Sequence, residues 1–360
     1  MKKVVTVLGA RPQFIKAAVI SRVIADSDFI TEVIVHTGQH FDTNMSEVFF
    51  DEMDIPKPHY NLNINGLGHG AMTGQMLEKI EEVLKIEKPD CVLVYGDTNS
   101  TLAGALAAKK LHIKVAHVEA GLRSFNMNMP EEINRILTDR ISDYLFAPTQ
   151  SAINNLRSEG YDNLSCKVVK SGDVMLDAAL FYAKMEKKPD VNLVSSYVLC
   201  TIHRSENTDE ESTLRDIMSA LELISERTQV VMPLHPRTRK KLESLEYNFD
   251  QGKISFIDPV GYLEMIYLLS RCQLVISDSG GLQKEAFFFK KKCLIVREET
   301  EWTELVEGGY NFICGTSKEK ILDSYNTVLE NNTTDFSVPL YGDGKTGEKI
   351  ILELQRELKC

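Results

Sequence analysis

The sequence lacks the features that disulfide-bonded, metal-binding, nucleic-acid-binding and membrane proteins need. Its seven cysteines form no C-x-x-C pair, and their odd number without close spacing argues against a disulfide framework or a zinc site. A formal net charge of −11 argues against nucleic acid as the main partner, because binding to a phosphate backbone needs a basic face. No apolar run approaches the ~20 residues that span a bilayer, and Val4–Leu8 is too short for a signal peptide. We therefore expect a cytoplasmic protein with no metal and no membrane partner.

What is present is typical of a two-domain α/β protein. The 360 residues suffice for two cores, and the apolar share of 43% is ordinary for a globular chain. Short β-branched runs alternate with helical patterns, which predicts parallel sheets covered on both faces. The alternation restarts after 150–196, a polar stretch that we expect to be irregular. We predict an N-terminal Rossmann-like domain over 1–170 and a C-terminal one over 171–344, facing one central cleft. The final helix, 345–360, is expected to pack back on the first domain.

Clusters of polar residues follow the predicted strands directly. Ligands of such sheets bind at the carboxyl ends of the strands, so these clusters predict a shared active site. They are Gly9–Lys16, His36–His40, Gly96–Thr98, Glu119–Arg123, His203–Asn207, His235–Arg237 and Asp278–Glu285.

The most informative of these clusters is the corner at Asp278–Glu285. A buried strand is predicted to end there, Gly280 and Gly281 follow, and a helix begins. Free N–H groups at a helix N-terminus bind phosphate or diphosphate well. Glu285 lies about one and a half turns further along, at ~3.6 residues per turn, within reach of a sugar hydroxyl beyond the phosphate. The corner therefore predicts a nucleoside diphosphate, although an ordinary strand–turn–helix corner is the alternative.

Together the motifs resemble those of the non-hydrolysing UDP-N-acetylglucosamine 2-epimerases, from Gly9 to about Gly315. The resemblance rests on motifs in the family's order, which are Gly9-Ala10-Arg11-Pro12, Thr37-Gly38-Gln39-His40, Gly96-Asp97-Thr98, His117-Val118-Glu119-Ala120-Gly121-Leu122-Arg123, Pro130-Glu131-Glu132-Ile133-Asn134-Arg135, His203-Arg204 with Glu206-Asn207, and Asp278-Ser279-Gly280-Gly281. It implies the glycosyltransferase-B architecture. It also implies inversion of C2 in a UDP-2-acetamido sugar: the C2 proton is removed, UDP leaves to give a glycal, and UDP adds back. No cofactor is implied.

The resemblance also implies a role for each matching residue. Asp97, Glu119 and Glu131 match the carboxylates that act as acid and base, and which is which stays open. Clustered carboxylates raise one another's pKa, which suits proton exchange near neutral pH. The other matches are Lys16 in the active site, Arg11, His203, Ser279, Gly280 and Gly281 at the diphosphate, Glu285 at the ribose, His235 near the nucleotide, and Arg135 beside Glu131 or the diphosphate.

Simpler readings compete with several of these roles. Glu119 or Glu131 could be a salt-bridge partner of Arg123 or Arg135. Lys16 could be a solvated helix lysine, although this corner makes that less favoured. His235 could cap the end of a strand rather than touch a ligand.

Departures from the family pattern suggest a particular branch. The family's usual Gly-Thr-Arg-Pro-Glu has Ala10 and Gln13 here, Lys284 stands where glutamate is common, and 124–129 also differs. These variants resemble the branch acting on UDP-2,3-diacetamido-2,3-dideoxy-glucuronate, a precursor of surface polysaccharides. Losing a carboxylate at Gln13 and gaining a cation at Lys284 would suit that additional negative charge. Plain UDP-N-acetylglucosamine stays an equal candidate.

The resemblance also bears on regulation and assembly. Many bacterial members have an activating site that uses a Gln-His-Arg segment, whereas Phe41 follows Gln39-His40 here, which predicts that the activation is absent. The family is often homodimeric. Three other functions remain open, namely a UDP-sugar glycosyltransferase of the same architecture, a hydrolysing epimerase, and a non-catalytic UDP-sugar sensor. The three carboxylates argue against the transferase and the sensor.

Overall fold

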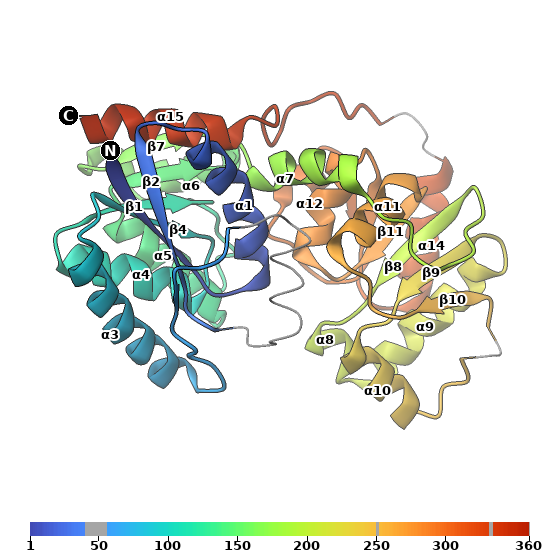
Figure 1. Ribbon diagram of the computed structural model, residues 1–360. Helices are drawn as coiled ribbons and strands as arrows, with labels where there is room; N and C mark the ends of the chain where they lie inside the picture. Colours follow the sequence, from blue (N-terminus) through green and yellow to red (C-terminus); the bar gives the residue numbers. More distant parts are fainter. Residues whose placement is uncertain (40–55, 250–251, 331–333, 360) are drawn as a thin grey trace. The chain divides into compact units, whose positions relative to one another are not determined.

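The computed structural model describes residues 1–39, 56–249, 252–330 and 334–359. It divides the chain into two compact units: unit 1 comprises Met1–Leu180 with Pro339–Cys360, and unit 2 comprises Phe181–Val338. Each unit has one parallel sheet with helices packed around it (Figure 1). The predicted α/β class with two parallel sheets is therefore confirmed.

Unit 1 alternates strands and helices along the chain. Its strands are β1 (Lys2–Leu8), β2 (Ile30–His36), β3 (Tyr60–Asn61), β4 (Cys91–Tyr95), β5 (Lys114–Val118), β6 (Tyr144–Ala147) and β7 (Lys167–Lys170). Its helices are α1 (Arg11–Ala25), α3 (His69–Glu87), α4 (Asn99–Lys110), α5 (Pro130–Ile141), α6 (Gln150–Ser158), the 3₁₀ turn η1 (Tyr161–Asn163) and α15 (Thr346–Lys359). Helix α7 (Val174–Tyr182) crosses the boundary between the units.

Unit 2 repeats the same alternation. Its strands are β8 (Tyr197–Thr201), β9 (Gln229–Pro233), β10 (Ile254–Ile257), β11 (Leu274–Ser277), β12 (Lys292–Ile295) and β13 (Asn311–Ile313). Its helices are the 3₁₀ turn η2 (Ala183–Met185), α8 (Ser205–Thr208), α9 (Glu211–Ser225), α10 (Pro236–Ser244), α11 (Tyr262–Arg271), α12 (Gly280–Phe288), α13 (Thr303–Glu307) and α14 (Lys318–Glu330).

The strand order of each sheet fixes where a ligand would bind. The first sheet runs β3-β2-β1-β4-β5-β6-β7 and the second β10-β9-β8-β11-β12-β13. The order reverses between β1 and β4 in unit 1, and between β8 and β11 in unit 2. The crevice at such a reversal, at the carboxyl ends of the strands, is where open α/β sheets bind ligands. The loops after these four strands, together with the start of α1, carry the clusters of Lys16, Asp97, His203 and Asp278.

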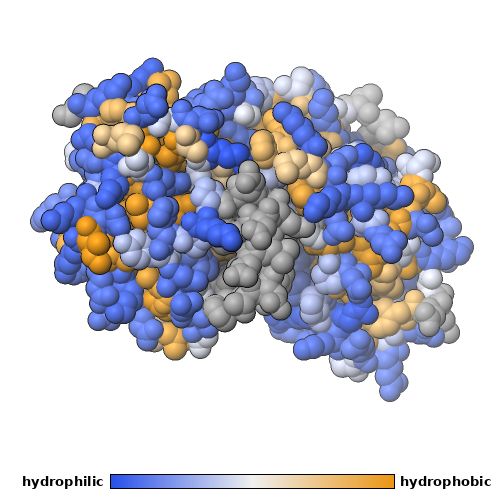
Figure 2. All heavy atoms as spheres, in the orientation of Figure 1, coloured by the Kyte–Doolittle hydropathy of each residue, from blue (hydrophilic) through white to orange (hydrophobic). Residues whose placement is uncertain are grey.

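The strands form because they are β-branched, apolar and buried on both faces. Val4, Val5 and Val7 of β1 have no exposed surface, as expected of a central parallel strand. Helix α4 packs closely on this strand, because a Cβ on Gly104 would lie only 3.2 Å from Val7. Surface residues are mostly hydrophilic on the face shown in Figure 2, with hydrophobic residues in small groups. The burial thus follows the sequence pattern.

One expectation about the fold is only partly right. The stretch 150–196 is irregular from residue 186 on, but its earlier part holds α6, β7 and α7. Its signal is weak since α6 has only nine residues, with Ala152, Ile153 and Leu156 buried among polar neighbours. Helix α15, red in Figure 1, packs against α1. Among the described helices, none has the length and apolar character needed to cross a membrane.

Candidate active site

Lys16 and Glu119 meet at the carboxyl edge of the first sheet. Lys16 lies in α1, and Glu119 directly follows β5 with a backbone φ of +74°. Their side chains form an ion pair, and each is only 10% exposed. A Cβ on Gly96 would lie 3.4 Å from Lys16 Nζ and 3.9 Å from Glu119 Oε2. The pair therefore lies beside the loop after β4, and Lys16 is not a solvated helix lysine.

Asp97, on that loop, pairs with Arg135 from α5. The Asp97 side chain is 32% exposed and that of Arg135 is 10% exposed. Asn134 donates to the Asp97 carbonyl oxygen at 2.9 Å, which holds the backbone as well. The unit 1 edge thus carries two neighbouring cation–carboxylate pairs, one partly open to solvent and one enclosed.

Arg135 binds Glu132 rather than Glu131. Glu132 is completely buried and accepts from Arg135 at 2.7 Å. Burial acts to raise its pKa, but hydrogen bonds from Ser124 and Phe125 and the charge of Arg135 hold the pKa below its ordinary value. Glu131, in the first turn of α5, is exposed. No role was predicted for Glu132 from the sequence, although it lies three residues before Arg135 and therefore on the same helix face.

A second buried network lies under the same loop. Asp139 lies 2.7 Å from His117 Nδ1 and accepts from Arg123 at 2.7 Å and from the Gly121 amide at 3.0 Å. Burial acts to raise the Asp139 pKa, but His117 and Arg123 lower it below its ordinary value. His117 Nε2 donates to the Gly96 carbonyl at 2.7 Å. Arg123 is therefore used structurally, and it pairs with neither Glu119 nor Glu131.

Gln13 also supports the backbone of this edge. Its Oε1 accepts from the amides of Gly9 and Ala10 at 2.8 and 3.0 Å. Its Nε2 donates to the Tyr95 carbonyl at 2.7 Å and to Thr98 Oγ1 at 3.0 Å. The residue is 1% exposed and both ends of its amide are used, so Gln13 holds the backbone of this edge from within the fold.

In unit 2, Asp278 holds the loop that carries His203. The carboxylate has no exposed surface, and it accepts from the amides of His203 at 3.0 Å and Arg204 at 2.9 Å. It also accepts from Asn207 Nδ2 at 3.0 Å. Asp278 is thus a structural anchor between the loops after β8 and β11, a role the sequence did not reveal.

His203 and His235 lie next to each other on this edge. Their ring centroids are 5.6 Å apart, and the His203 side chain is 38% exposed. His235 Nδ1 accepts from the Arg237 amide at 3.2 Å and so caps α10. Partial burial, with the nearby His203 and Arg237, lowers the His235 pKa. A neutral His235 keeps its Nε2 as a donor for an anion while Nδ1 caps the helix.

The corner after β11 is the helix N-terminus that the sequence predicted. Ser279 is the N-cap of α12, and Gly280 and Gly281 are its first residues. Their N–H groups have no partner within the helix. A Cβ on Gly281 would meet no described atom within 4 Å, so the backbone is open to a ligand. Glu285 is 9% exposed on the second turn.

Lys284 and Trp302 pack beneath this corner. Lys284 is 3% exposed, and its Nζ lies 4.2 Å from the centroid of the Trp302 ring. Trp302 in turn donates from Nε1 to the Gly280 carbonyl at 3.0 Å. A Cβ on Gly280 would overlap the Glu301 carboxylate, which pairs with Arg297. Lys284 therefore supports Gly280 from within unit 2.

Three predicted positions have no structural account. His40 and Phe41 lie outside the described residues, as does the side chain of Arg11 at the start of α1.

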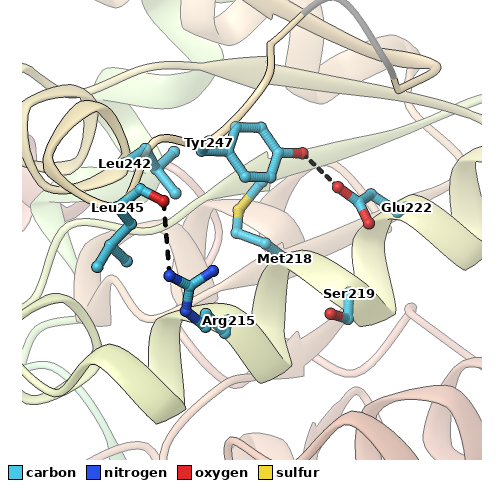
Figure 3. Close-up of a pocket in the computed structure, with 7 residues that line it drawn as sticks. All are labelled: Arg215, Met218, Ser219, Glu222, Leu242, Leu245 and Tyr247. Carbon is cyan, nitrogen blue, oxygen red and sulfur yellow. Dashed lines mark hydrogen bonds between the residues drawn. The ribbon is translucent and has the colours of Figure 1, made fainter.

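A separate cavity of about 200 Å³ between α9 and α10 is lined by Arg215, Met218, Ser219, Glu222, Leu242, Leu245 and Tyr247 (Figure 3). Tyr247 donates to Glu222 there at 2.7 Å. None of the residues with a predicted role lines this cavity.

Comparison with known proteins gives a consistent result. The family model described as UDP-N-acetylglucosamine 2-epimerase matches residues 22–355. A UDP-2,3-diacetamido-2,3-dideoxy-D-glucuronate 2-epimerase of Pseudomonas aeruginosa is 54% identical over 97% of this chain and 98% of its own. The crystal structure of Methanocaldococcus jannaschii UDP-GlcNAc 2-epimerase with UDP-GlcNAc and UDP matches with a TM-score of 0.88 and 44% identity, over 99% of this chain and 100% of its own. The crystal structure of UDP-GlcNAc 2-epimerase from Neisseria meningitidis bound to UDP-GlcNAc matches with a TM-score of 0.87 and 33% identity, over 98% of this chain and 100% of its own.

Proposed function

Because the chain belongs to the UDP-N-acetylglucosamine 2-epimerase family of isomerases, we propose that it inverts C2 of a UDP-2-acetamido sugar without hydrolysing it. The observation that carries the proposal is the grouping of Lys16–Glu119 and Asp97–Arg135 around Gly96, where the strand order reverses. Two carboxylates with different exposure suit two different proton-transfer tasks. The product would supply surface polysaccharide synthesis.

We assign the UDP moiety to the unit 2 edge. The amides of Gly280 and Gly281 supply N–H groups to the diphosphate, with Ser279 beside them. His203 and His235 are side-chain donors on the neighbouring loops, and Glu285 is the residue for the ribose. Holding UDP in this way stabilises it after it has left C1, when it carries the full negative charge of a leaving group.

We assign the proton chemistry to the unit 1 edge. One carboxylate removes the C2 proton as the C1–oxygen bond to UDP breaks, which forms the double bond of the glycal. A second carboxylate delivers a proton to the opposite face as UDP adds back. Glu119, Asp97 and Glu131 are the candidates, with Lys16 and Arg135 as the cations that hold the first two.

The proposed substrate is UDP-2,3-diacetamido-2,3-dideoxy-glucuronate, with UDP-N-acetylglucosamine as the second candidate. The first is favoured because the chain is more similar to the Pseudomonas aeruginosa enzyme, at 54% identity, than to the Methanocaldococcus jannaschii UDP-GlcNAc 2-epimerase, at 44%. Steady-state assays of both purified UDP-sugars decide between them. Turnover of UDP-N-acetylglucosamine alone would contradict the first choice.

Solvent deuterium tests the reaction class. An epimerase of this type incorporates deuterium at C2 of the recovered UDP-sugar, with no accumulation of free UDP. A hydrolysing epimerase releases UDP together with a free amino sugar. A glycosyltransferase or a sensor leaves C2 unlabelled, so an unlabelled C2 would contradict the proposal.

We also propose that the protein is a homodimer in solution, because members of its family are often homodimers. Sedimentation velocity over a hundredfold concentration range tests this independently of activity. A monomer throughout the range would contradict it.

A further inference from the structure

Phe125 is an exposed aromatic residue on a strained turn of unit 1. It is 74% exposed, and its backbone φ is +59°. Positive φ in a bulky non-glycine residue is a steric outlier, and an exposed ring forgoes the stabilisation that burial gives. Both features occur in the loop between β5 and α5. Glycine there would remove the backbone strain, and a polar residue would remove the exposed apolar ring.

Positive φ elsewhere in the described residues has ordinary causes. Four of the seven non-glycine residues with positive φ lie at or just after the ends of α3, α4, α10 and α12, where a left-handed residue terminates the helix. These are Lys88, His112, Glu246 and Lys290. Asn63 belongs to a residue type that tolerates this conformation. Glu119 and Phe125 remain, and Glu119 is a proposed catalytic carboxylate. Strain without a local cause is typical of functional sites.

Glu132 fixes the turn that carries Phe125. This buried carboxylate accepts from the Ser124 amide, the Ser124 hydroxyl and the Phe125 amide, each at 2.9 Å. Hydrogen bonds to a buried carboxylate are among the stronger ones in proteins. The left-handed turn is therefore held in place, and the Phe125 ring is kept outside the core.

The same carboxylate ties Phe125 to the proposed reaction site. Glu132 accepts from Arg135 at 2.7 Å, and Arg135 pairs with Asp97. A shift of the turn would therefore disturb the group that positions Asp97. A ring that served only a subunit contact would not need this connection to a reacting carboxylate.

We propose that Phe125 is a specificity-determining residue whose ring packs against the acetamido-sugar half of the substrate, and that Glu132 is its positioning residue. The C–H face and the acetamido methyl groups of such a sugar are apolar surfaces that an aromatic ring contacts well. This inference rests on the proposed function, in which Asp97 acts on the same sugar.

The test separates sugar binding from UDP binding. In Phe125→Ala, the Kd of UDP-N-acetylglucosamine and the KM of whichever UDP-sugar is turned over should rise about tenfold. The Kd of UDP, measured by calorimetry, should stay within about twofold of the wild-type value. Phe125→Tyr keeps the ring and should restore most of the affinity. Met127→Ala is the matched control, because Met127 is 60% exposed on the same loop and should leave all constants unchanged.

Glu132→Gln tests the positioning role. It should reproduce the increase in KM and also lower kcat, since Arg135 loses one of its partners. In the double variant Phe125→Ala/Glu132→Gln, the increase in KM, expressed as a free energy, should be smaller than the sum of the two single increases. This is expected of residues that act through one another. Glu132→Asp should restore KM if its shorter carboxylate still accepts from the Phe125 amide. A crystal structure of that variant would show whether this hydrogen bond is present.

Three results would overturn the inference. They are unchanged sugar affinity in Phe125→Ala, equal loss of affinity for UDP and the UDP-sugar, and a change of oligomeric state with unchanged KM. Failure of the proposed function looks different. In that case the wild type shows no deuterium exchange at C2, while the calorimetric comparison of UDP and UDP-sugar still reports on the Phe125 contact.

Discussion

Lys16 and Glu119 form an enclosed ion pair at the point where the strand order of the first sheet reverses. Each side chain is 10% exposed, and Gly96, with a φ of +63°, lies beside both. Any other residue at position 96 would be strained by this φ, and its Cβ would be in van der Waals contact with the pair. Removal of one partner from such a pair takes the opposite charge away from a group with little access to water. The arrangement therefore limits how either residue can be changed without consequence for the site.

Glu119→Gln should abolish most of the activity while UDP still binds. The amide keeps the shape of the side chain but takes no proton, so kcat should fall by about 10²–10⁴-fold, the usual contribution of a general acid or base. The Kd of UDP should stay within about twofold, because the unit 2 groups assigned to UDP are left intact. Deuterium exchange at C2 and calorimetry are the measurements. Glu82→Gln, which removes the exposed Lys79–Glu82 pair of α3, is the control. Near-normal exchange in Glu119→Gln would exclude Glu119 as a proton carrier.

Gly281→Ala should stabilise the free protein and weaken its binding of UDP. A Cβ there meets no described atom within 4 Å, and alanine restricts the unfolded chain more than glycine does. The free energy of unfolding should therefore rise by roughly 0.4–1 kcal/mol. If a phosphate approaches this backbone, the added methyl group should raise the Kd of UDP about tenfold or more.

Thermal unfolding with and without UDP measures both effects of Gly281→Ala in one experiment. Gly74→Ala is the matched control, because Gly74 lies in the exposed part of α3 and no described atom lies within 4 Å of its Cβ position. Gly66 is unsuitable, because its φ of +68° would strain an alanine. Gly74→Ala should stabilise the protein without any change in UDP affinity. Unchanged UDP binding in Gly281→Ala would mean that the phosphate lies elsewhere.

The stability contributed by Glu132 should disappear in acid. Burial acts to raise its pKa, but the hydrogen bonds of Ser124 and Phe125 and the charge of Arg135 place the pKa below the ordinary 4.5. The folded protein therefore takes up this proton less readily than the unfolded chain does. The stabilisation is complete above about pH 4.5 and is lost as the pH falls through the lowered value.

Urea unfolding of Glu132→Gln and the wild type at several pH values tests this. The difference in free energy of unfolding should be roughly 3–5 kcal/mol at pH 7, the usual cost of breaking a buried ion pair. It should shrink below pH 4.5. Glu131→Gln, at an exposed position on the same helix, should show little difference at any pH. A difference that stays constant with pH would mean that the charge of Glu132 does not contribute.

The distinction between Glu131 and Glu132 shows where sequence reasoning stops. Residues three and four positions apart both share a helix face, so Arg135 could be matched to either glutamate. The choice is made by the amides of Ser124 and Phe125, which reach Glu132 from a loop whose path no local pattern reveals. Buried carboxylates of this kind become recognisable only when their donors are placed.

Other parts of the molecule were predictable because one physical signal dominates them. Strand β11 and the Gly280–Gly281 corner combine an apolar run with an abrupt polar and glycine-rich boundary. The buried role of Asp278 was not predictable, because a carboxylate at the same edge could equally have faced a ligand. The same holds for Gln13, whose partners come from β4 and α4.

Lys284→Gln should act through Gly280 rather than on the charge of the substrate. Lys284 is 3% exposed, and its ammonium group lies over the Trp302 ring, so its removal should lower the free energy of unfolding by ~0.5–2 kcal/mol. Because Trp302 donates to the Gly280 carbonyl, affinities for UDP, UDP-N-acetylglucosamine and the diacetamido-glucuronate should all fall by a similar factor. Calorimetry with the three ligands is the measurement. Trp302→Phe, which keeps a ring but loses the N–H donor, should produce the same uniform loss. A loss confined to the glucuronate would instead give Lys284 a direct part in recognising the additional carboxylate, as its place in the sequence first suggested.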